Sequence, residues 1–93
     1  EGSTDAVNIL TRKIVEIALR HNASGVVLAH NHPGGLAIAS RADIFTTVRL
    51  YEALKPISIK LMDHIIVSGD DYTSMLQSGM LSDEYIQSMH SNL

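Results

Sequence analysis

The sequence contains no cysteine, and this absence limits the kind of metal site that the chain can form. Without cysteine there is neither a disulfide framework nor a thiolate zinc site, so a bound metal must be held by nitrogen and oxygen atoms. No apolar run approaches the roughly 20 residues of a membrane-spanning helix, and no secretory signal pattern opens the chain. These absences favour a domain that does not enter the membrane, with the cytoplasm as its default location.

The sequence also lacks a run of basic residues. Its 7 basic residues are scattered, and its 10 acidic residues give a net charge of -3. Proteins that bind nucleic acid usually show a basic stripe, so direct binding of DNA or RNA by this segment is disfavoured. The chain does have an apolar content of 45% in 93 residues, which is sufficient for one folded domain with its own core.

Hydrophobic periodicity predicts helices and strands in alternation. Residues 1–8 are expected to form a turn or linker, with Asp5 and Asn8 as capping residues, before an amphipathic helix from about Ile9 to His21. The run over 25–30 has the unbroken apolar character of a strand buried on both faces. Further elements are expected as a helix from 40 to before Pro56, a doubly buried strand over 58–68, a short antiparallel strand over 72–75 and a helix over 82–91. This order predicts a three-layer α/β domain.

Chemically informative residues gather between Val26 and Asp43. An apolar run leads to His30 and His32, a Pro-Gly-Gly turn follows, and Asp43 comes eleven residues after His32. Histidines two positions apart in extended backbone project to the same side. Two imidazoles and one carboxylate suit a divalent transition metal, zinc above all, and three protein ligands leave open the position that a catalytic zinc needs. The sequence therefore predicts a metal centre at the carboxyl end of a central strand, where α/β sheets bind their ligands.

Structural roles compete with this interpretation. His30 and His32 could be loop residues with ordinary hydrogen bonds. Ser40 and Asp43 fit the capping box that often starts a helix, and a capping box needs no metal. The two interpretations are compatible, because Ser40 could cap the helix while Asp43, in its first turn, faces an ion.

Other polar residues are expected to have structural roles. Asp63 and His64 are interpreted as a buried, hydrogen-bonded pair on a strand, with a supporting role at the metal or substrate as the alternative. His21 is expected to complement the dipole at the end of the first helix, and His90 to be a solvated residue of the tail.

The complete pattern H-x-H-P-x6-S-x-x-D resembles a known signature. It is similar to the JAMM (MPN+) zinc metallopeptidase motif, which consists of a distant Glu, then H-x-H, seven residues and S-x-x-D. His30, His32, Ser40 and Asp43 match this spacing without a gap. The H-N-H-P-G core, the S-R-x-D-I start of the second helix and the L-M-D-H-I-I-V segment at 61–67 resemble the bacterial RadC family more narrowly, over roughly residues 2–81.

This resemblance implies a fold and an activity. The fold would be a JAB/MPN domain over residues 1–81, a cytidine-deaminase-like α/β fold with a mixed sheet flanked by helices, followed by a short helical tail over 82–93. His30, His32 and Asp43 would be zinc ligands with water as the fourth, and Ser40 would help to hold that water or the developing oxyanion. The implied reaction is hydrolysis of peptide or isopeptide-type amides in a peptide or protein substrate.

The sequence departs from the family pattern at the general base. The family's catalytic Glu lies upstream of residue 1, whereas Glu1 is misplaced in the pattern and Glu16 falls within the predicted first helix. We therefore expect no general base in these 93 residues. If the family's leading strands are also missing, an open sheet edge would remain, and such an edge favours a homo-oligomer.

Two functions from other classes remain as alternatives. A non-catalytic MPN-type interaction module would keep the fold for assembly, although such modules commonly lose the ligands that this chain retains. A DNA-repair accessory domain would match the name attached to the family, but the missing basic surface argues against it. A nuclease reading of the letters H-N-H fails because nuclease sites of that name do not place the three residues consecutively. A deaminase reading fails because P-C-x-x-C is absent.

Overall fold

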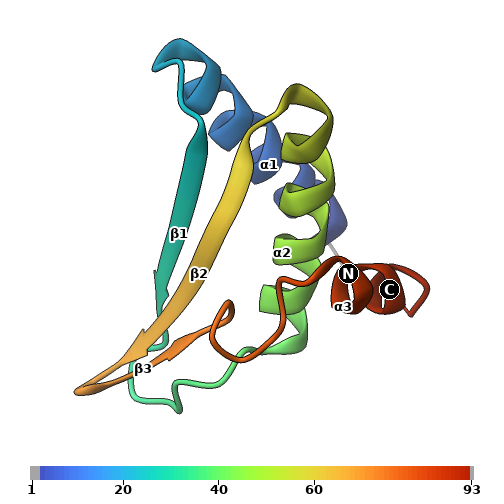
Figure 1. The fold of residues 1–93 in the computed structure, drawn as a ribbon. Helices are drawn as coiled ribbons and strands as arrows, with labels where there is room; N and C mark the ends of the chain where they lie inside the picture. The colour runs from blue at the N-terminus through green and yellow to red at the C-terminus, as the bar shows by residue number, and fades with distance from the viewer. Residues whose placement is uncertain (1–2, 93) are drawn as a thin grey trace.

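Over residues 3–92, the part that the computed structural model describes, a three-stranded sheet packs against α-helices (Figure 1). The helices are α1 (Ser3–Arg20), α2 (Arg41–Leu54) and α3 (Asp83–His90), and a short 3-10 helix, η1 (Lys55–Ile57), follows α2. The strands are β1 (Gly25–Asn31), β2 (Lys60–Ser68) and β3 (Asp71–Ser74), in the order β1-β2-β3. β1 and β2 are parallel, whereas β2 and β3 are antiparallel. The predicted α/β class with a mixed sheet is confirmed, and within residues 3–92 the helices lie on one side of the sheet.

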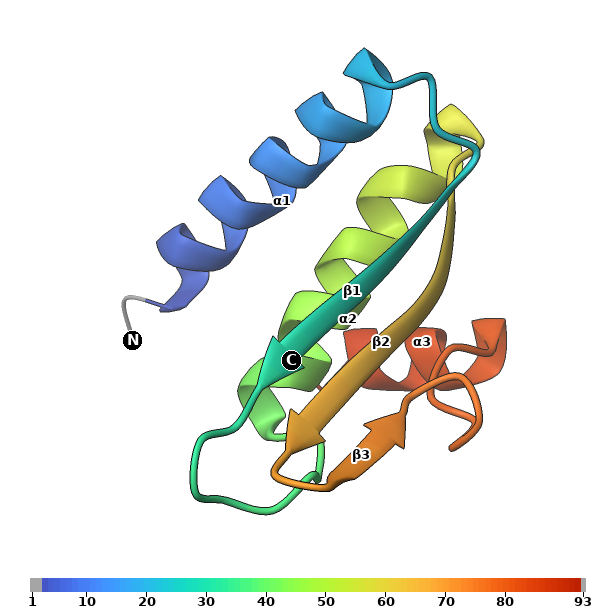
Figure 2. The same cartoon turned by 90° about the vertical axis from the view of Figure 1, so that its left-hand side faces the viewer.

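Helix α2 lies at the centre of the hydrophobic core. Figure 2 shows β1 and β2 in front of α2, with α1 alongside it, and Figure 1 shows α3 on the side of α2 away from β1. Val48, Leu50 and Leu54 of α2 are almost inaccessible to solvent, and they cluster with Ile66 of β2 and with Met75. Burial of this apolar cluster is the main force that holds α2 against the sheet. The opposite face of the sheet carries no helix within residues 3–92.

Helix α1 begins earlier than predicted. The sequence favoured a helix over 9–21, but α1 spans Ser3–Arg20, so the linker expected over 1–8 is wrong for residues 3–8. Val7 is buried, and the Asn8 side chain accepts a hydrogen bond of 2.9 Å from Arg49 of α2. Asn8 is therefore an interhelical contact rather than a cap, because packing on α2 outweighs the polar composition of this turn. Glu1, Gly2 and Leu93 lie outside the described residues.

The sequence predicted that strand β1 is buried on both faces, but the described residues cover only one of its faces. Val26 and Leu28 pack against the core, but Val27 and Ala29 are exposed on the other face. The same helix-free face also exposes Met62 and Tyr72, so the expected double burial of β2 is likewise incomplete. An unbroken apolar run predicts a strand, but it does not reveal how many of its faces are covered.

The outer edge of β1 has no strand partner among the described residues. Ser24 accepts a hydrogen bond from Lys60 N–H, and His32 N–H donates to the Val67 carbonyl at 2.8 Å, so the even-numbered residues of this segment face β2. The backbone groups of odd-numbered residues such as Val27 and Ala29 consequently point outward. This is the open edge that the sequence led us to expect.

The remaining elements lie within a few residues of their predicted positions. β2 begins at Lys60 rather than at residue 58, because Ser58 ends η1 in the left-handed conformation (φ 60°). Ser82 caps α3, and Ile86 of α3 is buried in the core. His90 ends α3 with its side chain 61% exposed, so it is solvated as predicted, and its Nδ1 lies 2.9 Å from Glu52 of α2. None of the helices in residues 3–92 has the length and apolar character needed to cross a membrane.

Candidate metal centre

The loop between β1 and α2 is fastened to the carboxyl end of the sheet. Ser68, the last residue of β2, donates a hydrogen bond to the Gly35 carbonyl, and Thr73 of β3 donates one to the Ala37 carbonyl. These two contacts fold the loop back across the ends of β2 and β3. The chain therefore returns to the start of α2 close to the point where β1 ends, as the Pro-Gly-Gly turn had indicated (Figure 1).

The first turn of α2 holds Asp43 in a fixed orientation. Ser40 Oγ accepts a hydrogen bond of 3.1 Å from Asp43 N–H, and Asp43 Oδ2 accepts one of 2.8 Å from Ser40 N–H. This reciprocal pair is the predicted capping box. Only 3% of the Asp43 side chain is exposed, so the capping box places a carboxylate in a largely buried position.

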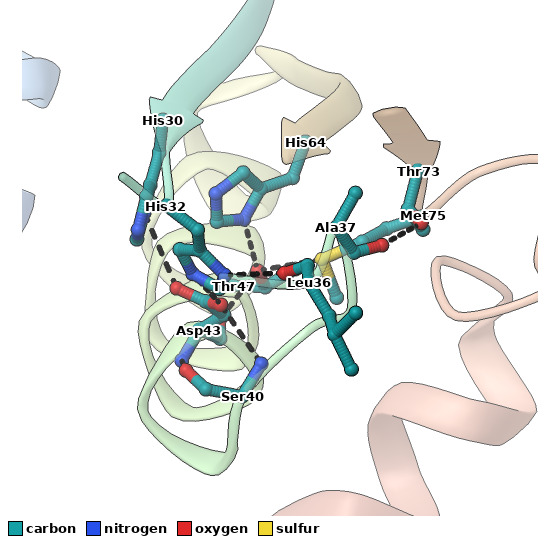
Figure 3. A network of polar contacts seen from close by, with 10 residues as sticks. All are labelled: His30, His32, Leu36, Ala37, Ser40, Asp43, Thr47, His64, Thr73 and Met75. Atoms are coloured by element: carbon teal, nitrogen blue, oxygen red, sulfur yellow. Dashed lines mark hydrogen bonds and ion pairs between the residues drawn. The ribbon is translucent and has the colours of Figure 1, made fainter. Parts of the chain in front are cut away.

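Two histidine side chains meet this carboxylate, one at each oxygen. His30 Nδ1 lies 3.2 Å from Asp43 Oδ1, and His32 Nε2 lies 3.0 Å from Asp43 Oδ2. The two imidazole rings are 4.7 Å apart, and Figure 3 shows both directed toward Asp43. The structure thus brings together the three residues that the sequence proposed as ligands. It also shows that Ser40 caps the helix beside them.

Both ring nitrogens of His32 face groups that can only accept. His32 Nδ1 lies 3.1 Å from the Leu36 carbonyl, and Nε2 lies 3.0 Å from Asp43 Oδ2. A neutral imidazole has one ring proton and can donate to only one of these two groups. If Nδ1–H donates to Leu36, a cation between Nε2 and the carboxylate would satisfy both of them. The donor set therefore fits a cation.

The environment of Asp43 favours its ionised form. Burial acts to raise the pKa of Asp43, but hydrogen bonds within the capping box and the positive charge of protonated His30 and His32 outweigh burial and hold the pKa below 3.8. The resulting stabilisation of the fold is fully present above pH 3.8, the ordinary value, and is lost as the pH falls through the lower pKa of the folded protein. At neutral pH the carboxylate is available as a metal ligand.

A fourth polar side chain, His64 of β2, reaches the same centre. It is 1% exposed, and burial lowers the pKa of its imidazole, which is therefore neutral at pH 7. Its Nδ1 lies 2.6 Å from Thr47 Oγ1, while its Nε2 has no hydrogen-bond partner among the described residues. One ligand atom each from His30, Asp43 and His64 lie within 4.8 Å of one another. These three residues form a group that could hold a metal ion.

The expected pairing of Asp63 with His64 is only partly correct. The His64 backbone N–H donates to Asp63, but the two side chains have different partners: His64 contacts Thr47, whereas Asp63 accepts from Ser74 Oγ. Neighbouring residues of a strand point to opposite faces. Residues two positions apart in a strand lie on the same face, so His64 shares the core face of β2 with Ile66. This alternation is the signal in the sequence that could have placed His64 on the side of the metal centre.

Loss of the Ser40 cap is expected to destabilise the protein. In Ser40→Ala, the Asp43 N–H loses its partner, and the free energy of unfolding should fall by about 1 kcal/mol in urea denaturation. Ser82→Ala is the matched control, because Ser82 Oγ accepts from Tyr85 N–H at the start of α3 in the same way. Both variants should lose similar stability, but only Ser40→Ala should weaken metal binding. Equal metal affinity of the two variants would contradict a role for the cap in orienting Asp43.

With this geometry in place, comparison with known proteins is informative. A family model described as RadC-like JAB domain matches residues 1–80. A UPF0758 protein of Cellvibrio japonicus is 44% identical over 81 residues, which are 87% of this chain and 36% of that protein. A UPF0758 protein of Bordetella bronchiseptica is 48% identical over 80 residues, 86% of this chain and 36% of that protein.

The chain thus spans 36% of the length of these curated relatives. The match covers both histidines, the capping box and His64, and the arrangement of helices and mixed sheet is consistent with a JAB-type fold. The chain belongs to the RadC-like JAB domain family.

Proposed function

We propose that this chain is the metal-holding part of a zinc-dependent hydrolase that acts on peptide or isopeptide-type amides. The observation that carries the proposal is the buried Asp43 carboxylate, which His30 and His32 approach to 3.2 and 3.0 Å. These three residues would hold Zn²⁺, in keeping with the JAMM resemblance. When bound, zinc would lower the pKa of a water molecule to about 7 and polarise a carbonyl group.

The residues around the ligands would keep them in position. The capping box fixes the Asp43 carboxylate, and the Leu36 carbonyl fixes the ring of His32. Ser40 Oγ accepts from Asp43 N–H, which leaves its hydroxyl proton free to donate to an oxyanion on the substrate. Among residues 3–92, the ligand cluster contains no second carboxylate, and Glu16 is exposed on α1. The general base would therefore come from a preceding segment of a longer protein.

The loop beside the ligands offers a surface for a peptide. Leu36 and Ile38 are 72% and 62% exposed, and the Leu36 carbonyl contacts His32 directly. Apolar side chains next to a hydrolytic centre can bind the side chains that flank an amide bond. The exposed apolar loop therefore supports a peptide or protein as the substrate. We also propose that the protein resides in the cytoplasm.

Zinc is expected to stabilise the folded chain. A metal that binds only the native state adds about 2.7 kcal/mol to the free energy of unfolding at a free concentration of 100 times Kd. Thermal unfolding should therefore shift to higher temperature with ZnCl₂ and return to the starting value with EDTA. The same concentration of MgCl₂ is the control, since magnesium prefers oxygen ligands. An unchanged Tm at saturating zinc would contradict the proposed metal centre.

A second candidate function is a protein-interaction module of the MPN type. The observation that favours it is the helix-free face of the sheet, where Val27, Met62 and Tyr72 are 59%, 48% and 59% exposed. Val27 lies beside the open edge of β1, whose outward backbone groups have no strand partner among residues 3–92, whereas Met62 lies on the next strand and Tyr72 on β3 at the opposite edge. Such edges pair readily with other strands.

This surface leads us to expect a homo-oligomer. Multi-angle light scattering should show a dimer or larger species, and Val27→Lys should increase the monomer fraction because a charge on an edge strand opposes pairing. Ile57→Lys is the matched control, since Ile57 is also exposed but lies in η1. A monomer at high protein concentration, or equal effects of the two substitutions, would argue against association through β1.

A further inference from the structure

We infer that His64 is a further ligand of the cation at this centre and approaches it through Nε2 from the buried side. This inference rests on the proposed function. It adds a nitrogen donor from β2 to the residues of the H-x-H and S-x-x-D pattern. The arguments are the direction of the hydrogen bonds around Thr47, the position of the His64 ring, and the absence of a hydrogen-bond partner for its Nε2 among residues 3–92.

The contacts of Thr47 determine the tautomer of His64. Thr47 Oγ1 lies 2.7 Å from the Asp43 carbonyl, 3.4 Å from Met75 Sδ and 2.6 Å from His64 Nδ1. The carbonyl can only accept and the thioether has no proton to give, so His64 is the one neighbour that can supply a hydrogen. Thr47 then donates its one proton to the Asp43 carbonyl and accepts from His64 Nδ1–H, while the weakly accepting Met75 sulfur lies in contact at 3.4 Å.

This arrangement leaves the lone pair of His64 on Nε2. Ligating histidines commonly donate their other ring N–H to a fixed acceptor, which sets the tautomer and the ring orientation. Thr47 fulfils that role for His64, as the Leu36 carbonyl does for His32. With a cation bound, both rings would present Nε2 to it and keep the proton on Nδ1.

The free nitrogen of His64 is directed into the centre. Figure 3 shows the ring of His64 between Thr47 and His30, with its second nitrogen on the side of His30. The centroids of these two imidazoles are 5.9 Å apart, and ligand atoms of His30, Asp43 and His64 lie within 4.8 Å of one another. A buried acceptor without a hydrogen-bond partner is unfavourable, and a cation would satisfy it.

A ligand from β2 would change the character of the site. His30 and His32 stand at the end of β1, and Asp43 begins α2, so His64 would tie the second strand to the same ion. Zinc with four protein ligands is typical of closed structural sites, and a water molecule could then enter only by raising the coordination number to five. The proposed ligand would thus make binding of substrate or water dependent on the position of His64.

Zinc affinity measured on the 93-residue chain tests this inference. The experiment is a competition titration of Zn²⁺ against a chromophoric chelator with wild type, His64→Asn, Thr47→Val and His21→Ala. Asparagine keeps a polar group near the position of Nδ1 but removes Nε2, whereas His21 is an exposed histidine at the end of α1. His64→Asn should weaken zinc binding by more than 100-fold. Thr47→Val keeps Nε2 of His64 but removes the partner of Nδ1 and the hydrogen bond to the Asp43 carbonyl, and should weaken binding by about 10- to 100-fold. His21→Ala should bind like wild type, and circular dichroism with EDTA present should show that each variant is folded.

Nitrogen NMR of wild-type protein with ¹⁵N-labelled histidine gives a readout that does not depend on a variant. Zinc should shift the Nε2 resonance of His64, while Nδ1 keeps its proton. If zinc does not change the Nε2 chemical shift and His64→Asn binds zinc as tightly as wild type, His64 is not a ligand. The proposed site at His30, His32 and Asp43 would be unaffected by that result. If wild type binds no zinc, the inference and the proposed metal centre both fail.

Discussion

Asp43→Ala is expected to abolish stoichiometric zinc binding. Metal-replete wild type should contain one zinc per chain by elemental analysis, and the variant close to none, because Asp43 is the carboxylate that both histidines contact. His30→Ala and His32→Ala should each reduce the zinc content strongly, since each removes one of the few ligands available. Equal zinc content in wild type and His32→Ala would rule out the proposed ligand set.

Loss of the metal ligand must be separated from loss of the helix cap. Asp43→Asn is the useful comparison, because its amide oxygen can still accept from Ser40 N–H while the negative charge is removed. It should retain more of the stability that Asp43→Ala loses, yet bind zinc poorly, since carboxylate is the better ligand. Full zinc occupancy in Asp43→Asn would show that the charge of Asp43 is not needed for binding.

The zinc-loaded chain is expected to be nearly inert toward peptide and isopeptide substrates. A general base typically contributes a factor of about 100 to 10,000, and residues 3–92 place none beside the ligand cluster. A full-length relative such as the Bordetella bronchiseptica protein, of which this chain matches 36%, should be faster by about that factor on the same substrates. In the JAMM motif the glutamate precedes H-x-H, so we expect the longer relative to supply it ahead of the matched region.

Variants of the longer protein would assign the roles within that activity. Replacing the residue that corresponds to Asp43 or His30 with alanine should abolish hydrolysis. Replacing the counterpart of Ser40 should cost about 2–4 kcal/mol of barrier if its hydroxyl stabilises an oxyanion. Full activity of the 93-residue chain would show that the base lies within it and that the motif alignment is wrong. If neither protein hydrolyses any of the substrates, the interaction-module function would be favoured.

Local signals in the sequence predicted the elements of this fold well. The capping residues of α2 and α3, the apolar strand runs and the turn after His32 are all properties of short segments. The same holds for the meeting of His30, His32 and Asp43, because only a loop separates them and its turn residues force it to reverse. The start of α1 depended instead on contacts of Val7 and Asn8 with distant residues. Composition of the turn alone could not reveal them.

His64 shows the limit of motif spacing more clearly. It lies 21 residues after Asp43, and it reaches the centre only because β2 pairs in parallel with β1, with His64 opposite Leu28. Neither the apolar run nor the spacing of the motif specifies that register. The exposure of Val27 has the same origin, since the number of covered faces of a strand depends on the whole sheet.

The capping box and the turn after β1 have a consequence for how zinc would act during folding. Three candidate ligands lie within fourteen residues of chain, from 30 to 43, so they can approach one another before β1 and β2 have paired. The unfolded chain could therefore bind the ion weakly, and binding to the unfolded state subtracts from the stabilisation of the native state. Only a ligand from β2 requires the parallel pairing, which closes late because it joins distant segments. The increase in the free energy of unfolding caused by zinc would then report how much of the zinc coordination depends on pairing of β1 with β2.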